Sequence, residues 1–103
     1  DFTKMDLRVG TIIEANKMPK TKKLMVLKVD TGLDKRTIVS GIAEHFKAEE
    51  LIGKKVTVLA NLAPRKLRGV ESEGMILLTE NAEGKLVFVN PDEDGVTNGA
   101  TIN

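Results

Sequence analysis

Short runs of alternating apolar and polar residues, separated by turn-forming residues, are the feature that most constrains how this chain can fold. The run from residue 7 to residue 14 alternates in this way, as a strand with one buried face requires. Helical character is confined to residues 44–51, and Gly53 ends that stretch. Further strands are predicted at 24–30, 36–41, 54–60, 75–79 and 86–89. The pattern therefore predicts an all-β protein with one short helix between its third and fourth strands.

The order of these elements is that of an OB-fold, a five-stranded Greek-key barrel, here with a C-terminal extension. At 103 residues the chain is long enough for one core, so residues 1–103 are interpreted as a single domain. That core is expected to be aliphatic. The polar residues after Pro91 predict a loose C-terminal tail. Element order alone also fits other small barrels.

Two basic segments fall at the places where an OB-fold binds its ligand. Residues 17–23 connect the first two predicted strands, and residues 62–74 connect the fourth and fifth. Together they hold seven of the sixteen Lys and Arg residues. These side chains have few apolar neighbours, so they must face water or an anion. Because these two connections bind oligonucleotides in OB-folds, a polyanion, most plausibly RNA, is the predicted partner.

The net charge of +1 conceals an uneven distribution of charge along the chain. Residues 1–70 carry fifteen basic and eight acidic side chains, whereas residues 71–103 carry one basic and seven acidic ones. A chance difference between solvated faces is one interpretation. The other, which we favour, is a basic face with a separate acidic tail.

The sequence offers no constellation of residues for catalysis, a metal or a cofactor. His45 is the one histidine, and no nucleophile or orienting partner can be assigned to it, so a solvated position is expected. Residues 69–74 begin like a phosphate-binding loop, but Met75 and Ile76 stand where Lys and Ser or Thr are required. The absence of cysteine fits a cytoplasmic protein. No apolar run approaches the roughly 20 residues of a membrane span, so no membrane partner is predicted.

Aromatic residues are scarce, which bears on the kind of RNA that could bind. There is no Tyr or Trp, and the three phenylalanines are expected at the terminus or in the core; they are Phe2, Phe46 and Phe88. Proteins that bind single strands stack bases on exposed aromatic side chains. Binding is therefore expected mainly through phosphate and ribose, with folded RNA favoured over single strands. A limited route to base stacking remains through Arg36, Arg65 and Arg68.

Three small polar residues stand where apolar strands are predicted to meet loops. They are Ser40, Asn61 and Ser72. Their side chains could form the floor of a groove and meet a phosphate, a ribose hydroxyl or a base. They could equally cap strand ends and turns, as Ser and Asn commonly do. The pattern leaves both interpretations open.

Six blocks of the sequence share their order with a known family. They are residues 6–10, 23–30, 38–43, 53–55, 58–62 and 66–75. The last block, Lys66-Leu-Arg-Gly-Val-Glu-Ser-Glu-Gly-Met75, is highly specific. Over nearly its whole length the chain resembles the EMAP II-type tRNA-binding domain. Within that family it is most similar to the C-terminal domain of bacterial methionyl-tRNA synthetases.

The resemblance implies an OB-fold that binds tRNA by its folded shape. It also implies a binding pocket and loop formed by Ser40, Asn61, Lys66, Arg68, Ser72, Glu73 and Met75. Residues 20–23 match a more variable basic segment, and Met18-Pro19 replaces the His-Pro that is commoner in the family. With the other cations, the predicted RNA-binding residues are Lys20, Lys22, Lys23, Arg36, Ser40, Asn61, Arg65, Lys66, Arg68, Ser72, Glu73 and Met75.

From the resemblance we expect a non-catalytic module with low sequence specificity that raises the tRNA affinity of a synthetase and dimerises it. Its expected partners are tRNA, a second copy of the chain and the catalytic domains of the parent enzyme, with no cofactor. The start at Asp1 rather than Met favours a domain excised from such a protein. Two alternatives remain: a stand-alone dimeric tRNA-binding protein, and a related export chaperone that binds peptides in an apolar groove.

Overall fold

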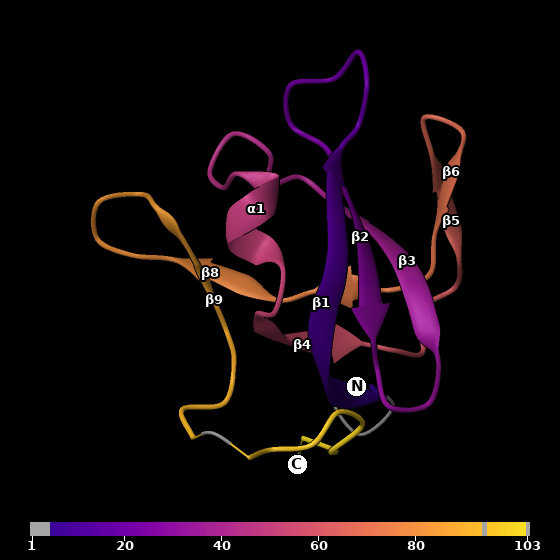
Figure 1. Cartoon of the computed structure of the whole chain (residues 1–103), viewed down its shortest axis with the longest axis vertical. Coiled ribbons are helices and arrows are strands. Elements are labelled where there is room, and N and C mark those ends of the chain that lie inside the picture. The colour runs from indigo at the N-terminus through magenta and orange to yellow at the C-terminus, as the bar shows by residue number, and fades with distance from the viewer. Residues whose placement is uncertain (1–4, 94, 103) are drawn as a thin grey trace.

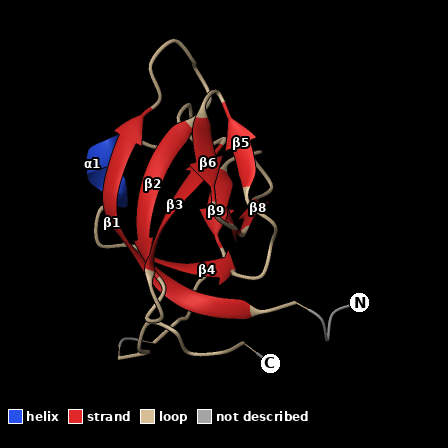
Figure 2. Ribbon diagram, turned by 90° about the vertical axis from the view of Figure 1, so that its right-hand side faces the viewer, coloured by secondary structure: helices blue, strands red, loops and turns tan. Residues whose placement is uncertain are grey.

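The computed structural model describes residues 5–93 and 95–102, and Phe2 lies outside these ranges. It consists of short antiparallel strands with one short helix (Figures 1 and 2). The elements are β1 (Leu7–Lys17), β2 (Met25–Asp30), β3 (Lys35–Ser40), α1 (Ala48–Leu51), β4 (Lys55–Leu59), β5 (Arg65–Leu67), β6 (Val70–Ser72), β7 (Met75–Ile76), β8 (Leu78–Glu80) and β9 (Leu86–Phe88).

The main sheet has five strands in the order β3-β2-β1-β4-β7, and all of its pairs are antiparallel. β1 belongs to both halves of the barrel, since residues 7–11 pair with β4 and residues 11–17 pair with β2. A register shift between Ile12 and Glu14 accompanies this change of partner and bends the strand. Two residues before this shift, a Cβ atom on Gly10 would lie 2.9 Å from Val29 Cγ1, so a larger residue would crowd β2.

The barrel is nearly closed where the chain around β7 meets β3, and we call this junction the seam. The main-chain N–H of Glu73 donates to the carbonyl of Thr37 at 2.8 Å. The N–H of Val39 donates to the Ser72 hydroxyl at 2.9 Å. The predicted OB-like barrel, with its helix between the third and fourth strands, is confirmed.

The core inside the barrel is aliphatic, as predicted. Its most deeply buried large side chains include Ile12, Met25, Leu27, Ile38, Ile42, Leu51, Val56 and Val58. Phe46 and Phe88 pack at the margin of this cluster with their ring centroids 4.9 Å apart. Burying this much apolar surface is the main term that stabilises a domain of this size.

Several predicted element boundaries were wrong. β1 continues to Lys17 rather than ending at residue 14, because after the bulge its second half still has β2 as a partner. The helix covers Ala48–Leu51 rather than 44–51, because residues 43–45 form a separate turn that precedes it. The segment 62–74, predicted as a loop, contains the hairpin β5–β6. The strand predicted at 75–79 is divided between β7 and β8.

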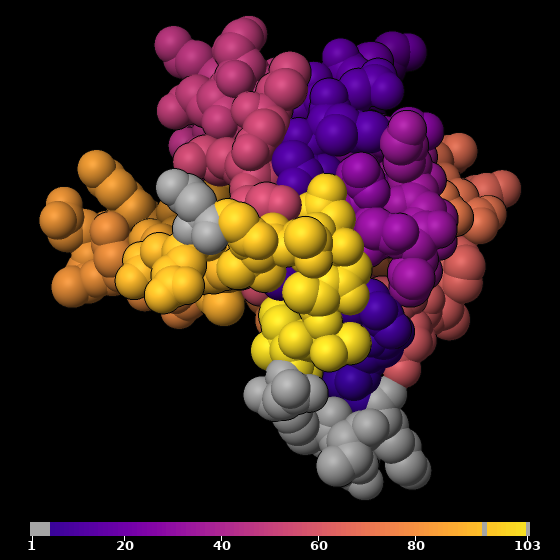
Figure 3. All heavy atoms as spheres, turned by 60° about the horizontal axis from the view of Figure 1, so that its bottom comes forward, coloured from indigo at the N-terminus to yellow at the C-terminus, as the bar shows by residue number. Residues whose placement is uncertain are grey.

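The C-terminal segment is not the loose tail that was predicted. Residues 98–102 run beside the first half of β1, and Figure 3 shows this segment in yellow against the indigo strand. Val9 N–H donates to the Ala100 carbonyl at 3.0 Å, and Ile102 N–H donates to the Leu7 carbonyl at 2.9 Å. The segment therefore covers an edge of β1 that β4 does not reach, which satisfies backbone groups that would otherwise need water.

Candidate nucleic-acid interface

The β5–β6 hairpin presents three cations beside the barrel. Its register pairs Arg65 with Ser72, Lys66 with Glu71 and Leu67 with Val70. The connecting residues Arg68 and Gly69 have φ angles of 50° and 83°, as the type I′ turn of a two-residue hairpin requires. Because alternate residues of a strand face opposite sides, Arg65 lies on the same face as Leu67, and Lys66 lies on the other face, opposite the Glu71 carboxylate.

The β1–β2 loop is anchored from beneath by Met18. This side chain is only 4% exposed, and its main-chain N–H donates to the Leu24 carbonyl at 2.9 Å. The Thr21 hydroxyl donates to the Met18 carbonyl at 3.1 Å. The anchored loop leaves three lysine side chains exposed: Lys20, Lys22 and Lys23. Met18 therefore acts as a buried anchor for this loop.

The loop and the hairpin turn line one basic groove. Both project from the same end of the barrel (Figure 1). The groove has a cavity volume of about 360 Å³ and is lined by Lys20, Thr21, Lys22, Lys23, Leu24 and Arg68. Within residues 5–93 and 95–102, none of its four cations forms an ion pair. Uncompensated cations in a concave site concentrate positive potential and attract polyanions such as a nucleic-acid backbone.

The cations at the tips of the two segments share an uncommon backbone conformation. Lys20 has a φ of 64° and Arg68 a φ of 50°, and among the described residues these are the two outside glycine with positive φ. Asn or Gly occupies such positions with less strain. The left-handed conformations thus place a long cation where turn chemistry alone would favour a short residue, and both of these cations face the same groove.

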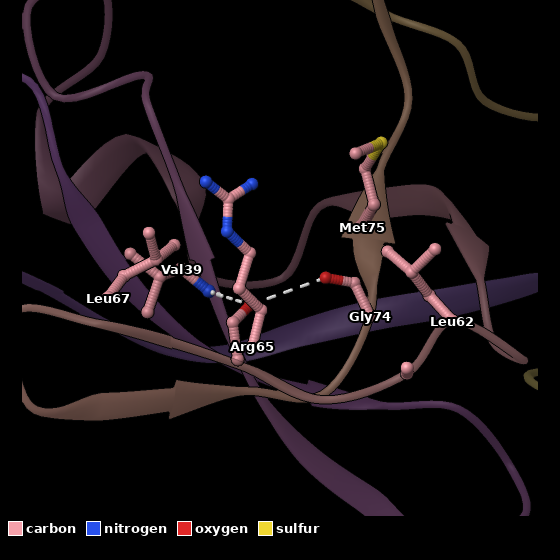
Figure 4. A pocket seen from close by; sticks show the side chains of 8 residues that line it. Val39, Leu62, Arg65, Leu67, Gly74 and Met75 are labelled. Atoms are coloured by element: carbon pink, nitrogen blue, oxygen red, sulfur yellow. Dashed lines mark hydrogen bonds between the residues drawn. The ribbon is translucent and has the colours of Figure 1, made fainter.

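A second pocket lies beside the groove on the seam side of the hairpin (Figure 4). It has a cavity volume of about 140 Å³ and is lined by Val39, Leu62, Ala63, Arg65, Leu67, Ser72, Gly74 and Met75. Figure 4 shows the Arg65 guanidinium rising between the Leu67 and Met75 side chains. The Ser72 hydroxyl accepts from Val39 N–H and donates to the Gly74 carbonyl at 3.3 Å. The pocket is therefore mainly apolar, with one free guanidinium.

Arg36, a predicted RNA-binding residue, is tied into the seam. Its Nε donates to the Asp34 carboxylate at 2.9 Å, and its Nη1 donates to the carbonyls of Ala60 and Glu73. The Arg36 side chain is only 18% exposed. Its hydrogen bond, followed by one from the Thr31 hydroxyl, lowers the pKa of the Asp34 carboxyl below its usual value. These contacts join β3 to the ends of β4 and β6.

The remaining predicted site residues lie around the seam rather than in the groove. The Asn61 side-chain oxygen accepts from Asp6 N–H at 2.9 Å, where the chain leaves β4. The Glu73 carboxylate accepts from Thr37 N–H at 3.3 Å, while its side chain remains exposed. Ser40 is half-buried at the end of β3. Of the predicted residues, the structure thus brings Lys20, Lys22, Lys23 and Arg68 into the groove, and Arg65, Ser72 and Met75 into the pocket.

Sequence reasoning missed the apolar walls of the pocket. These walls include Val39, Leu62 and Leu67, and none of the three is among the predicted RNA-binding residues, although Leu62 and Leu67 lie in the predicted binding segment 62–74. The available signal was the presence of apolar residues within a basic, supposedly solvated segment. Leu62 and Met75 are 41% and 49% exposed, so both present apolar surface beside the hairpin.

Other kinds of site receive no support from the described ranges. His45 is exposed in the turn before α1, as expected of a solvated histidine. Over residues 5–93 and 95–102 there is no group of three metal-binding side chains. In the same part of the chain, no helix has the length and apolar character needed to cross a membrane.

Comparison with known proteins identifies the family to which this geometry belongs. Residues 7–100 match the family model described as "Putative tRNA binding domain". The chain belongs to the tRNA-binding domain family. The tRNA-binding domain is a non-catalytic module, and this one is homologous to the C-terminal part of methionyl-tRNA synthetase. The resemblance carried by the six sequence blocks is therefore confirmed.

The relatives of this tRNA-binding domain include both synthetases and chaperones. Over all 103 residues it is 89% identical to the methionine–tRNA ligase of Christiangramia forsetii, of which it spans 15%. Its structure is similar to a methionyl-tRNA-synthetase-related protein from Pyrococcus horikoshii, with a TM-score of 0.89, 44% identity and coverage of 98% of this chain and 92% of that one. The chaperone CsaA of Bacillus anthracis gives a TM-score of 0.87 at 29% identity, covering 100% and 94% of the two chains.

Proposed function

We propose that this domain binds tRNA through the phosphate backbone and folded shape, with little preference among tRNA sequences. The observation that carries the proposal is the groove in which four unpaired cations from two segments converge. Lysine and arginine contacts to phosphates supply affinity but carry no sequence information. Binding is expected to be weak for the domain alone, in the micromolar range by order of magnitude.

The salt dependence of binding tests this proposal. If the four groove cations meet phosphates, a plot of log affinity against log salt concentration should have a slope of about −3 to −4. Affinities for several unrelated tRNAs should agree within a few-fold, since the contacts do not read bases. A slope near zero, measured by filter binding or fluorescence anisotropy, would rule out the electrostatic account.

We further propose that the domain serves a cytoplasmic methionyl-tRNA synthetase as an appendix that raises tRNA affinity. The support is the near-identity to a small part of methionine–tRNA ligases. Activation of methionine and its transfer to tRNA would then belong to the catalytic domains of the parent enzyme. Residues 1–103 should fold as one domain but show no ATP–pyrophosphate exchange. Exchange activity in a clean preparation would contradict this division of labour.

Homodimerisation is the third part of the proposal. The β8–β9 hairpin supports it, because this two-stranded sheet stands apart from the barrel sheet and exposes Val87 and Val89, each at 43%. Pairing such edges across a two-fold axis would cover them. Light scattering at tens of micromolar should give twice the chain mass of 11.2 kDa. A species of 11.2 kDa alone would exclude a dimer at that concentration.

A peptide-binding chaperone is the second candidate. It is favoured by the structural likeness to CsaA and by the apolar walls of the pocket beside the hairpin. The two candidates differ in the ligand that changes the mobility of the domain on a native gel. We expect tRNA to do so at micromolar concentration and an unfolded polypeptide to have no effect. A mobility shift caused by the unfolded polypeptide and not by tRNA would establish the peptide-binding function instead.

A further inference from the structure

We propose that the pocket beside the hairpin receives one unpaired nucleobase of the bound RNA, stacked against Arg65 and Met75, and that the pocket does not read the identity of that base. This inference rests on the proposed function, since it assigns a second contact to the same bound tRNA. It adds an apolar component to a complex otherwise held by phosphates.

The size and lining of the pocket suit a flat, mostly apolar group. Its cavity volume of about 140 Å³ is below the roughly 300 Å³ at which pockets for whole drug-sized ligands begin. Five of its eight lining residues are aliphatic or Met, so burial of an apolar ring would be favourable. One base fits this description better than a complete nucleotide, whose sugar and phosphate would remain outside.

Two side chains at the pocket offer surfaces on which a base can stack. The Arg65 guanidinium is planar, is exposed and forms no ion pair with any described residue, so it is free to lie over a ring. The Met75 side chain is 49% exposed, and its polarizable thioether makes favourable contacts with aromatic rings. Together they replace the exposed aromatic residues that single-strand binders use and that this sequence lacks.

The polar groups at the floor of the pocket are already occupied. The Ser72 hydroxyl accepts from Val39 N–H at 2.9 Å and donates to the Gly74 carbonyl. Reading a base requires free donors and acceptors aimed at its edge. The Ser72 hydroxyl is engaged on both sides, and a guanidinium lying flat over the ring points its N–H groups past that base rather than at its edge. Stacking is then the main interaction that remains, and all four bases have faces that can stack. A base can therefore bind here without conferring sequence preference.

The pocket and the groove are adjacent, so one stretch of RNA can occupy both. Leu67 lines the pocket and Arg68, the next residue of the hairpin, lines the groove. Their Cα atoms are about 3.8 Å apart across the peptide bond. A phosphate held at Arg68 and a base held over Arg65 would thus belong to one short stretch of RNA. Paired bases cannot reach the pocket, which selects for an unpaired position.

The test uses the full 103-residue chain and RNA hairpins that carry one 2-aminopurine, a base whose fluorescence falls when it stacks. In one hairpin the 2-aminopurine is unpaired in a bulge, and in the other it is paired. We expect the wild-type protein to change the fluorescence of the bulged base and to leave that of the paired base unchanged. Replacing the bulged 2-aminopurine with each of the four ordinary bases should leave the affinity unchanged within a few-fold.

Two variants assign the effect to the pocket. Met75→Ala should weaken binding of the bulged hairpin about fivefold or more, the range found for loss of base stacking. Arg65→Lys keeps the charge but loses the planar group, so it should also weaken binding while leaving the salt slope unchanged. Leu33→Ala, which removes a 62% exposed apolar side chain elsewhere, serves as the matched control and should bind as the wild type does. Circular dichroism would verify that each variant is folded.

The outcomes separate this inference from the proposed function. Salt-dependent tRNA binding without a fluorescence change would overturn the base pocket and leave the phosphate-binding function intact. Absence of tRNA binding altogether would overturn both. If an unfolded polypeptide binds in a way that Met75→Ala abolishes while RNA binding is unaffected, the occupant is a peptide side chain and the inference is wrong.

Discussion

The seam and the β5–β6 hairpin both carry arginine, but they engage it differently. At the seam, the mostly buried Arg36 is bonded to the Asp34 carboxylate and to two main-chain carbonyls. On the hairpin, Arg65 and Arg68 are exposed and form no ion pair with described residues. The comparison teaches that the partners of a cation, more than its charge, separate an arginine that holds a fold together from one that is available to a ligand.

The largest effect should come from disrupting the seam. We expect Arg36→Ala to lower the free energy of unfolding by about 2–3 kcal/mol, because it leaves two carbonyls and a carboxylate without a charged donor. For a domain of this size, that corresponds to a fall in Tm of roughly 10 °C or more. Thermal denaturation followed by circular dichroism would measure it. Loss of tRNA affinity with an unchanged Tm would instead make Arg36 an RNA contact.

The second effect concerns the hairpin turn. Arg68→Ala should weaken the binding of all tRNAs alike, by about 1 kcal/mol of binding free energy. It should also flatten the salt slope by about one unit, since one phosphate contact is lost. Arg68→Asn should weaken binding to the same extent while leaving Tm unchanged or a degree or two higher, because Asn suits the left-handed turn position. A variant that lost stability but kept its affinity would assign Arg68 to the fold.

Asn61, which follows β4, should show a smaller effect. Asn61→Ala removes the acceptor for Asp6 N–H. Because this hydrogen bond is exposed, a water molecule can partly take the place of the lost acceptor. We expect a loss of about 0.5–1 kcal/mol in unfolding free energy, with the salt slope of tRNA binding unchanged. Urea denaturation and anisotropy titrations would be compared. If instead affinity falls while stability is preserved, the Asn61 amide contacts RNA directly.

The smallest effect should appear on acidification. The pKa of Asp34 is lowered in the folded state, so its carboxylate stabilises the fold above its usual value of 3.8, and this contribution is lost as the pH falls through the lowered value. Asp34→Asn should therefore lower Tm by only a degree or two at pH 7, since the Asp34 side chain is 48% exposed and solvent screens its charge. Once the pH is below the lowered pKa of Asp34, the melting temperatures of the wild type and of Asp34→Asn should converge. A difference that persists there would have another cause.

Much of the barrel could be predicted because its signals are local. Strand alternation and turn residues gave the element order, and the two basic segments lie at the expected end of the barrel. The bulge in β1 and the pairing of residues 98–102 with it could not be predicted, because a tertiary partner decides them. The polar residues 97–99 predicted a loose tail, but in the structure Asn98 accepts hydrogen bonds from Thr11 and Lys55.

The site was predictable in its charge but not in its contacts. The sequence predicted the same role, RNA binding, for Arg36, Arg65 and Arg68, because all three are cations near predicted loops. Only the folded backbone brings two carbonyls to Arg36 and leaves the other two without acidic partners. The apolar pocket likewise depends on β3 and the β4–β5 connection converging, which no local pattern encodes.

The pairing of the C-terminal segment with β1 has a consequence for the order of events during synthesis. β1 is made early, yet Arg8 bonds to the Gly99 carbonyl, 91 residues later in the chain. At roughly 5–20 residues per second, the ribosome needs about 5–20 seconds to supply that partner. Contacts of such long range also slow folding itself. The edge of β1 therefore stays open on the nascent chain until almost the whole domain has been translated, and this is the interval in which a ribosome-associated chaperone would have most to protect.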